Sequence, residues 1–256
     1  MIRILVESDY HCGHVLGLTP PDWQTKQSRK FAGPVWDWRE ALIEEIGHID
    51  IHILNGDLTD GPGRKETIGL FTTDVEEQAE IAAECARRVR AKKRFLTYGT
   101  PFHTVSTLSH ESLVAKELGA EIYETLRLEA GGVKFNFRHV VGRSDIPYGQ
   151  GTQVQKEIVR EQLNALAEGY DEASIMVRSH VHYFHHVETS RAHAFTTPAW
   201  ELPNPDSDGN IYARKLRTLY YDMGAVLIEV SDGEATIRKQ LMPLRVAIKR
   251  DYLKFE

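Results

Sequence analysis

Five short apolar runs, each followed closely by histidine or aspartate, constrain the fold of this chain more than any other feature. Their lengths and their β-branched residues predict buried strands. The residues that follow the runs are Asp9 with His11, Asp57, His103, His139, and His180 with His182. Loops at the carboxyl ends of strands in an open α/β sheet converge on one crevice. We therefore expect these side chains to meet although they are far apart in the sequence.

The rest of the pattern alternates helices with strands. Apolar residues at helical spacing predict helices over residues 36–46, 74–91 and 152–168, with a shorter one that ends at 118. Thr73 and Glu76 form a capping-box pattern at the start of the second helix. We assign the cations at 87–94 to the solvated end of that helix rather than to a nucleic-acid surface. Strands are expected at 2–6, 51–54, 95–98, 122–128, 133–137, 174–177, 183–189, 193–196, 225–230 and 235–240.

Length and composition limit the class of protein. The 256 residues permit one large α/β domain or two small ones. No linker is visible, so we expect one domain over 1–256 with loop insertions at about 15–35 and 197–221. The net charge of −6 argues against broad electrostatic binding of duplex nucleic acid. Two cysteines, an N-terminal apolar run too short for a signal peptide and no run of membrane-spanning length lead us to expect a soluble, cytoplasmic protein.

The mixture of carboxylates and imidazoles suits borderline divalent ions better than calcium or magnesium alone. Any single residue has another interpretation: Asp9 can be a turn residue, the histidines can be polar loop residues, and Asp60 is expected to tie its turn. Together, six or seven such side chains are too many for one tetrahedral ion. They suit two ions that share a bridging carboxylate. We expect two divalent ions, with manganese as first choice and iron, zinc, nickel or cobalt as alternatives.

The order of these motifs resembles that of the calcineurin-like metallophosphoesterase superfamily: D-x-H, G-D-x-x-D, G-N-H-D/E, a lone H and G-H-x-H. The matching segments are 9–11, 56–60, 99–103 in modified form, 139 and 179–182. The resemblance implies an α/β fold, a four-layer α/β/β/α sandwich of two mixed β-sheets flanked by helices. It also implies roles for the ligands. Asp9, His11 and His182 would hold the first ion, Asp57 would bridge, and His139 and His180 would hold the second.

The third motif departs from the family pattern. Thr100 stands where the family has a metal-binding asparagine, and His103 comes two residues later than expected. The resemblance implies that His103 is the acid that protonates the leaving group. It can instead replace the missing asparagine as a ligand, and Thr100 is a weaker alternative. Ser179 in place of glycine is a milder change.

These features predict hydrolysis of a phosphoester by hydroxide that two ions activate. We expect a nucleotide or nucleic-acid phosphodiester, because Trp23, Trp36, Tyr148 and Trp200 offer stacking faces in loops; packing of these rings onto the body is the alternative. Candidate phosphate-binding cations are Arg143, Arg178 and Arg214. The alternatives to a diesterase are a phosphomonoesterase or protein phosphatase, and a non-catalytic metal-binding scaffold of the same fold. No protein partner is indicated.

Overall fold

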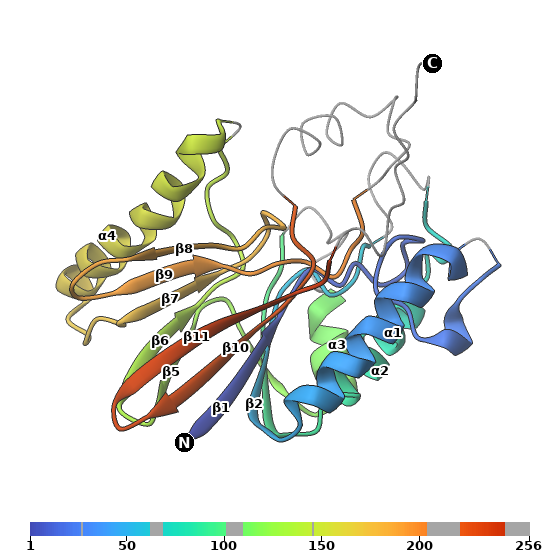
Figure 1. Cartoon of the computed structure of the whole chain (residues 1–256), viewed down its shortest axis with the longest axis horizontal. Coiled ribbons are helices and arrows are strands. Elements are labelled where there is room, and N and C mark those ends of the chain that lie inside the picture. The colour runs from blue at the N-terminus through green and yellow to red at the C-terminus, as the bar shows by residue number, and fades with distance from the viewer. Residues whose placement is uncertain (27, 62–68, 101–109, 145, 204–220, 244–256) are drawn as a thin grey trace, which may run out of the picture.

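The structure is a computed structural model that describes residues 1–26, 28–61, 69–100, 110–144, 146–203 and 221–243 (Figure 1). Two predicted site residues, His103 and Arg214, lie outside the described residues. In the part of the chain that is described, no helix is both long enough and apolar enough to cross a membrane.

The first sheet has six strands in the order β11-β10-β1-β2-β3-β4. Strands β1 to β4 run parallel to their neighbours, and the hairpin of β10 and β11 joins β1 antiparallel. The bounds are β1 (Ile2–Glu7), β2 (Ile49–Asn55), β3 (Ala91–Thr97), β4 (Glu121–Tyr123), β10 (Gly224–Ser231) and β11 (Glu234–Leu241). The carboxyl ends of β1 and β2 therefore lie side by side at one edge.

The second sheet has five strands in the order β5-β6-β7-β9-β8. Its three central strands are parallel, and the two outer strands are antiparallel to them. The bounds are β5 (Leu126–Ala130), β6 (Val133–Phe137), β7 (Ile175–Arg178), β8 (His185–Glu188) and β9 (His193–Thr196). Both sheets are mixed, as predicted.

Successive side chains along a strand point to opposite faces of its sheet, so each strand contributes to the layers on both sides of it. On β1, Ile4 and Val6 pack between the sheets, while Leu5 faces the helices. That helical layer consists of α1 (Arg29–Ile46), α2 (Val75–Arg87) and α3 (His110–Leu118). On the far side, α4 (Gln150–Glu168) packs Val154 and Ile158 against the outer face of the second sheet. The result is the predicted four-layer α/β/β/α sandwich (Figure 1).

Three local predictions are wrong. Helix α1 begins at Arg29 and runs through Pro34, so the first expected insertion is partly helical; a short 3-10 helix at Pro21–Trp23 precedes it. The predicted strand over 122–128 divides into β4 and β5, which belong to different sheets. The predicted helix over 74–91 ends at Arg87, because residues from Ala91 onward pair with β2.

The cap and the cations of α2 also differ from the prediction. The N-cap is Asp74, whose carboxylate accepts hydrogen bonds from the backbone of Glu76 and Glu77, so the Thr73 capping box is wrong. Most of the cations at 87–94 belong to the turn after α2 and to β3 rather than to a helix end. Lys92 pairs with Asp50 at 2.8 Å.

A buried ion pair between Arg39 and Glu7 links α1 to the end of β1. Arg39 donates from Nε and Nη2 to the two oxygens of Glu7, at 2.9 and 2.8 Å. Tyr10 and His52 also contact Glu7 Oε2, at 2.6 and 2.9 Å. All four side chains are buried. The pair therefore holds the strand end from which Asp9 and His11 follow.

We expect Arg39→Met to lower the free energy of unfolding by about 3–5 kcal/mol, because it leaves the Glu7 carboxylate buried without its counter-charge. Urea denaturation of the metal-free protein measures this. The matched control is Arg238→Met, whose ion pair with Glu229 is largely exposed and should cost about 0–1 kcal/mol. Similar losses in the two variants would contradict a structural role for the buried pair.

Candidate metal centre

The predicted ligands occupy unusual backbone positions at the strand ends. Five of the six have positive φ angles between 47° and 73°: Asp9, His11, Asp57, His180 and His182. Positive φ is uncommon for residues other than glycine, and it persists only where the surroundings impose it, most often at functional sites. Here the turn after β1 is bonded to the turn after β2, by Asp9 N to Gly56 O at 3.0 Å and His11 N to Asp57 O at 3.1 Å.

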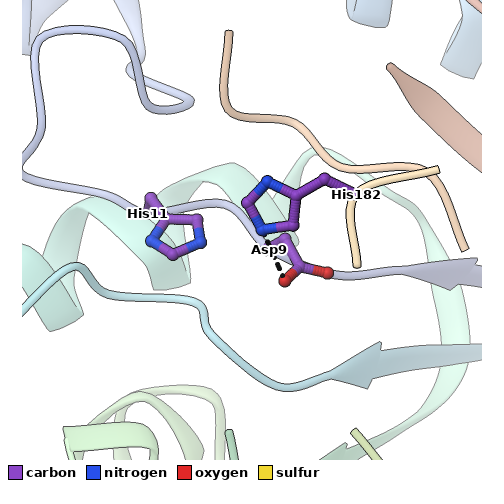
Figure 2. Close-up of side chains that lie close together, drawn as sticks. All are labelled: Asp9, His11 and His182. Carbon is purple, nitrogen blue, oxygen red and sulfur yellow. Dashed lines mark ion pairs between the residues drawn. The ribbon is translucent and has the colours of Figure 1, made fainter. Parts of the chain in front are cut away.

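Asp9, His11 and His182 form the first group (Figure 2). His182 Nε2 lies 3.1 Å from Asp9 Oδ1, and the rings of His11 and His182 have centroids 5.2 Å apart. Two of these residues come from the turn after β1 and the third from the turn after β7. The convergence of strand ends that the sequence predicts is therefore present in the structure.

Asp57, His139 and His180 form the second group. His139 Nε2 lies 2.9 Å from Asp57 Oδ2, and His180 Nδ1 lies 4.0 Å from the same oxygen. The two groups are adjacent, since His139 Nε2 is 3.9 Å from Asp9 Oδ1. The structure thus brings all six predicted ligands together in two neighbouring groups, with Asp57 in the second.

Thr100 enters the second group as well. Its Oγ1 donates to Asp57 Oδ2 at 2.8 Å and lies 3.3 Å from His139 Nε2 and 3.1 Å from His180 Nδ1. Its backbone N–H donates to Asp57 Oδ1 at 2.6 Å. The hydroxyl therefore lies within hydrogen-bonding distance of all three members of the group.

Three of the histidines are oriented through Nδ1. His139 donates to the Asn55 carbonyl at 2.7 Å, and His11 donates to Asp60 at 2.9 Å. His182 donates to the Tyr221 hydroxyl at 3.1 Å, because that hydroxyl itself donates to the Glu201 carbonyl. Each donation from Nδ1 leaves Nε2 as the atom that can bind a metal ion. Asp60 thus orients a predicted ligand, a role beyond the turn contact expected of it.

The donor set fits divalent ions. Asp9 Oδ2 accepts from His180 N at 3.4 Å, but the buried Oδ1 accepts no hydrogen bond from any described residue, although His182 Nε2 is near. Burial opposes charge on Asp9, yet His182 and His139 outweigh it and hold its pKa at about 2. Burial likewise opposes charge on His139, but Asp57 and Asp9 raise its pKa to about 9. Buried carboxylates here need positive charge close by, and a metal ion would supply it.

Two glycines make room for the second group. A Cβ on Gly56, where φ is +81°, would lie 2.6 Å from atoms of the His139 ring. A Cβ on Gly99 would lie 2.2 Å from Asp57 Oδ1. The close approach of the turns after β2 and β3 therefore requires glycine at both positions.

We expect Gly56→Ala to lower the free energy of unfolding by about 2–4 kcal/mol, from left-handed strain plus the clash with His139. Gly169→Ala is the matched control: φ there is +74°, but a Cβ would meet nothing within 4 Å, so only the strain of about 1–2 kcal/mol remains. Urea denaturation of the metal-free proteins compares them. An equal loss in both would show that the His139 contact is unimportant.

A third group joins His11 and Asp60 to Glu201, a residue that sequence reasoning missed. Glu201 Oε2 lies 3.9 Å from His11 Nε2 and 3.8 Å from His182 Nδ1. Its place is set by its backbone N–H, which donates to Asp9 O at 3.2 Å. Glu201 and Tyr221 lie in the segment 197–221 that was assigned to loop, and neither directly follows a predicted strand, so the strand-end pattern could not identify them.

The predicted substrate-binding residues differ in their burial and in their partners. Arg178 is buried and bonded to Glu157 at 2.7 Å and to Asn136, so its assignment to phosphate is wrong. Trp36 and Trp200 are buried in the core, which confirms packing rather than stacking for both. Trp23 is half-buried and donates to Glu84 at 2.8 Å. Tyr148 is exposed and remains a candidate stacking face.

Comparisons with known proteins give matches among solved structures. No protein-family model matches the chain, and no curated protein matches it. Similar solved structures include Vps29 complexed with zinc from Entamoeba histolytica, at 16% identity over 94% of this chain and 98% of that chain, with a TM-score of 0.46. A novel archaeal phosphodiesterase has 11% identity over 93% and 100%, with a TM-score of 0.47. A predicted phosphoesterase from Streptococcus pneumoniae TIGR4 has 13% identity over 93% and 98%, with a TM-score of 0.39.

The chain has the four-layer α/β/β/α architecture that the resemblance of the motifs implies. Its two mixed sheets and flanking helices are those predicted.

Proposed function

We propose that the protein is a metal-dependent phosphodiesterase with two divalent ions in one site. The observation that carries this proposal is the pairing of two groups of carboxylate and imidazole ligands, with the His139 Nε2 of one group 3.9 Å from the Asp9 Oδ1 of the other. When bound, the two ions would neutralise charge on the phosphoryl oxygens and lower the pKa of a bound water. Manganese is our first choice, with iron, zinc, nickel or cobalt as alternatives, because mixed oxygen and nitrogen donors suit these ions.

The residues of the chain would bind the ions, orient the ligands or donate a proton. Asp9, His11 and His182 would hold one ion and His139 and His180 the other, with Asp57 between them. Asn55, Asp60 and Tyr221 would keep three imidazoles turned toward the ions. His103 would protonate the leaving oxygen.

The substrate we propose is a nucleotide or nucleic-acid phosphodiester. The exposed Tyr148 ring supports this choice as a surface on which a base can stack. Two free cysteines, Cys12 and Cys85, both buried, support a reducing compartment such as the cytoplasm. The second candidate is a non-catalytic metal-binding scaffold, which the threonine at position 100 favours because it alters the third motif.

Turnover of two generic substrates tests the proposal. Metal-free protein is supplied with manganese and assayed with bis(p-nitrophenyl) phosphate and with p-nitrophenyl phosphate, with and without EDTA. We expect EDTA-sensitive hydrolysis that is faster for the diester. Faster hydrolysis of the monoester would support a phosphomonoesterase instead. Bound manganese without turnover of either ester would support the scaffold.

A further inference from the structure

Two histidine rings lie against each other on the hairpin of β8 and β9. His186 Nε2 lies 3.2 Å from His193 Nδ1, and the two rings are stacked, with centroids 5.3 Å apart and planes inclined by 23°. His193 pairs in register with Ile175, at the start of the parallel strand β7. The candidate ligands His180 and His182 follow the other end of β7, so this histidine pair is separate from the candidate metal centre.

The pleat of the hairpin places the two imidazoles and one carboxylate on the same face. His186 is opposite Phe195, which is two residues from His193, so the two histidines are diagonal neighbours across the strands. Glu188 is directly opposite His193 and two residues from His186. Glu188 is exposed, and its charge acts on the His186 ring. The hairpin therefore presents two nitrogen donors and one oxygen donor on one face.

The distance between the two nitrogens suits a shared metal ion. Zinc binds imidazole nitrogen at about 2.0–2.1 Å, so two such nitrogens on one tetrahedral ion lie about 3.3–3.4 Å apart. The 3.2 Å between His186 and His193 is close to this distance. A neutral imidazole can carry its proton on either nitrogen. The proton between the rings can therefore move to an outer nitrogen, which leaves both facing nitrogens available to an ion.

The surroundings of His186 favour the form that binds metal ions. Burial and the neighbouring His193 lower the pKa of this ring, although Glu188 acts in the opposite direction. The ring is therefore neutral at pH 7, and neutral imidazole is the form that coordinates a metal. Both histidines are partly exposed, and β8 is the last strand of its sheet, so an ion can reach the pair from solvent.

We propose that His186 and His193 bind a divalent ion of the zinc type between β8 and β9, with the Glu188 carboxylate beside them. Such an ion would join the edge strand β8, which has four residues, to β9. Short edge strands open locally at low cost, so the ion would stabilise this edge of the second sheet. The inference is independent of the proposed function, since neither histidine is a candidate ligand of the metal centre.

Equilibrium dialysis against micromolar zinc tests the site. Wild-type protein should bind one more equivalent per chain than His186→Gln or His193→Gln, because loss of either imidazole should weaken binding at least about tenfold. His185→Gln is the matched control and should bind as the wild type does. His185 belongs to the same strand but faces α4, where a Cβ on Gly151 would lie 2.7 Å from its Nε2.

The difference between these proteins does not depend on whether the candidate metal centre binds zinc, because all of them keep its ligands. Circular dichroism establishes that each variant is folded. Equal zinc content in the wild type and in folded His186→Gln and His193→Gln would overturn the proposal.

Hydrogen exchange of the β8 amides locates the ion. At zinc concentrations about tenfold above the dissociation constant, exchange in β8 should slow by about tenfold, because opening of the edge must release the ion. The same slowing is expected in His185→Gln and none in His193→Gln. Exchange in β8 that zinc leaves unchanged in the wild type, or slows equally in His193→Gln, would refute a site on this hairpin.

Discussion

Replacing Asp57 by asparagine is expected to lower hydrolysis of a phosphodiester at least about 10³-fold without unfolding the chain. Asp57 accepts from Thr100 and lies 2.9 Å from His139, so its carboxylate is the central acceptor of the second group. If it also bridges to the first ion, loss of its charge weakens both. Two ions supply several kcal/mol of transition-state stabilisation, and each 1.36 kcal/mol is about tenfold in rate.

The control for this variant is Asp232→Asn. Asp232 shares the left-handed backbone of Asp57, with φ of 54°, but lies in the turn between β10 and β11. Asp232→Asn should therefore retain both ions and full turnover. Circular dichroism and thermal unfolding establish that each variant is folded. Near wild-type rates in Asp57→Asn would show that Asp57 is not a ligand.

His103→Ala is expected to keep both ions and to slow esters with poor leaving groups by about 10²–10⁴-fold, the usual range for proton-transfer catalysis. A nitrophenyl ester needs little protonation of its leaving oxygen, so its rate should fall far less. Metal content and the rates on both kinds of ester, measured on the one variant, provide the test.

The competing role for His103 is that of a ligand in place of the missing asparagine. In that case His103→Ala would lose one ion and fail equally on both esters. The position of Thr100 supports the acid role, because its hydroxyl already lies within 3.3 Å of His139 and 3.1 Å of His180. Because Thr100 occupies the position next to His139 and His180, the second group does not require His103 as a ligand.

The strands were predictable because burial on both faces produces continuous apolar runs, as in β1 and β2. The break between β4 and β5 was not, because residues 122–128 are apolar enough for one strand and only tertiary pairing divides them between two sheets. The first part of α1, before residue 36, was not predicted because a proline such as Pro34 usually interrupts a helix. The packing of α1 on the first sheet, with Arg39 bonded to Glu7, outweighs the lost backbone hydrogen bond.

The candidate ligands were predictable for a similar reason. A ligand directly after a strand has a local signal, namely the apolar run before it, and strand ends converge in this class of fold. Glu201 and Tyr221 have no such signal, since a long-range backbone bond to Asp9 and a ring contact with His182 bring them to the site. Arg178 lies at the end of β7, where a phosphate-binding cation was expected. Its guanidinium is instead paired with Glu157 of α4.

Titration of the metal-free protein with manganese, followed by both ion binding and diester hydrolysis, tests the central claim most directly. The two-ion account predicts that bound manganese reaches two equivalents per chain and that activity rises until the second equivalent is bound. Asp57→Asn should bind less and remain inactive throughout. Saturation at one equivalent or none in the folded protein, or hydrolysis that does not depend on manganese, would contradict the account.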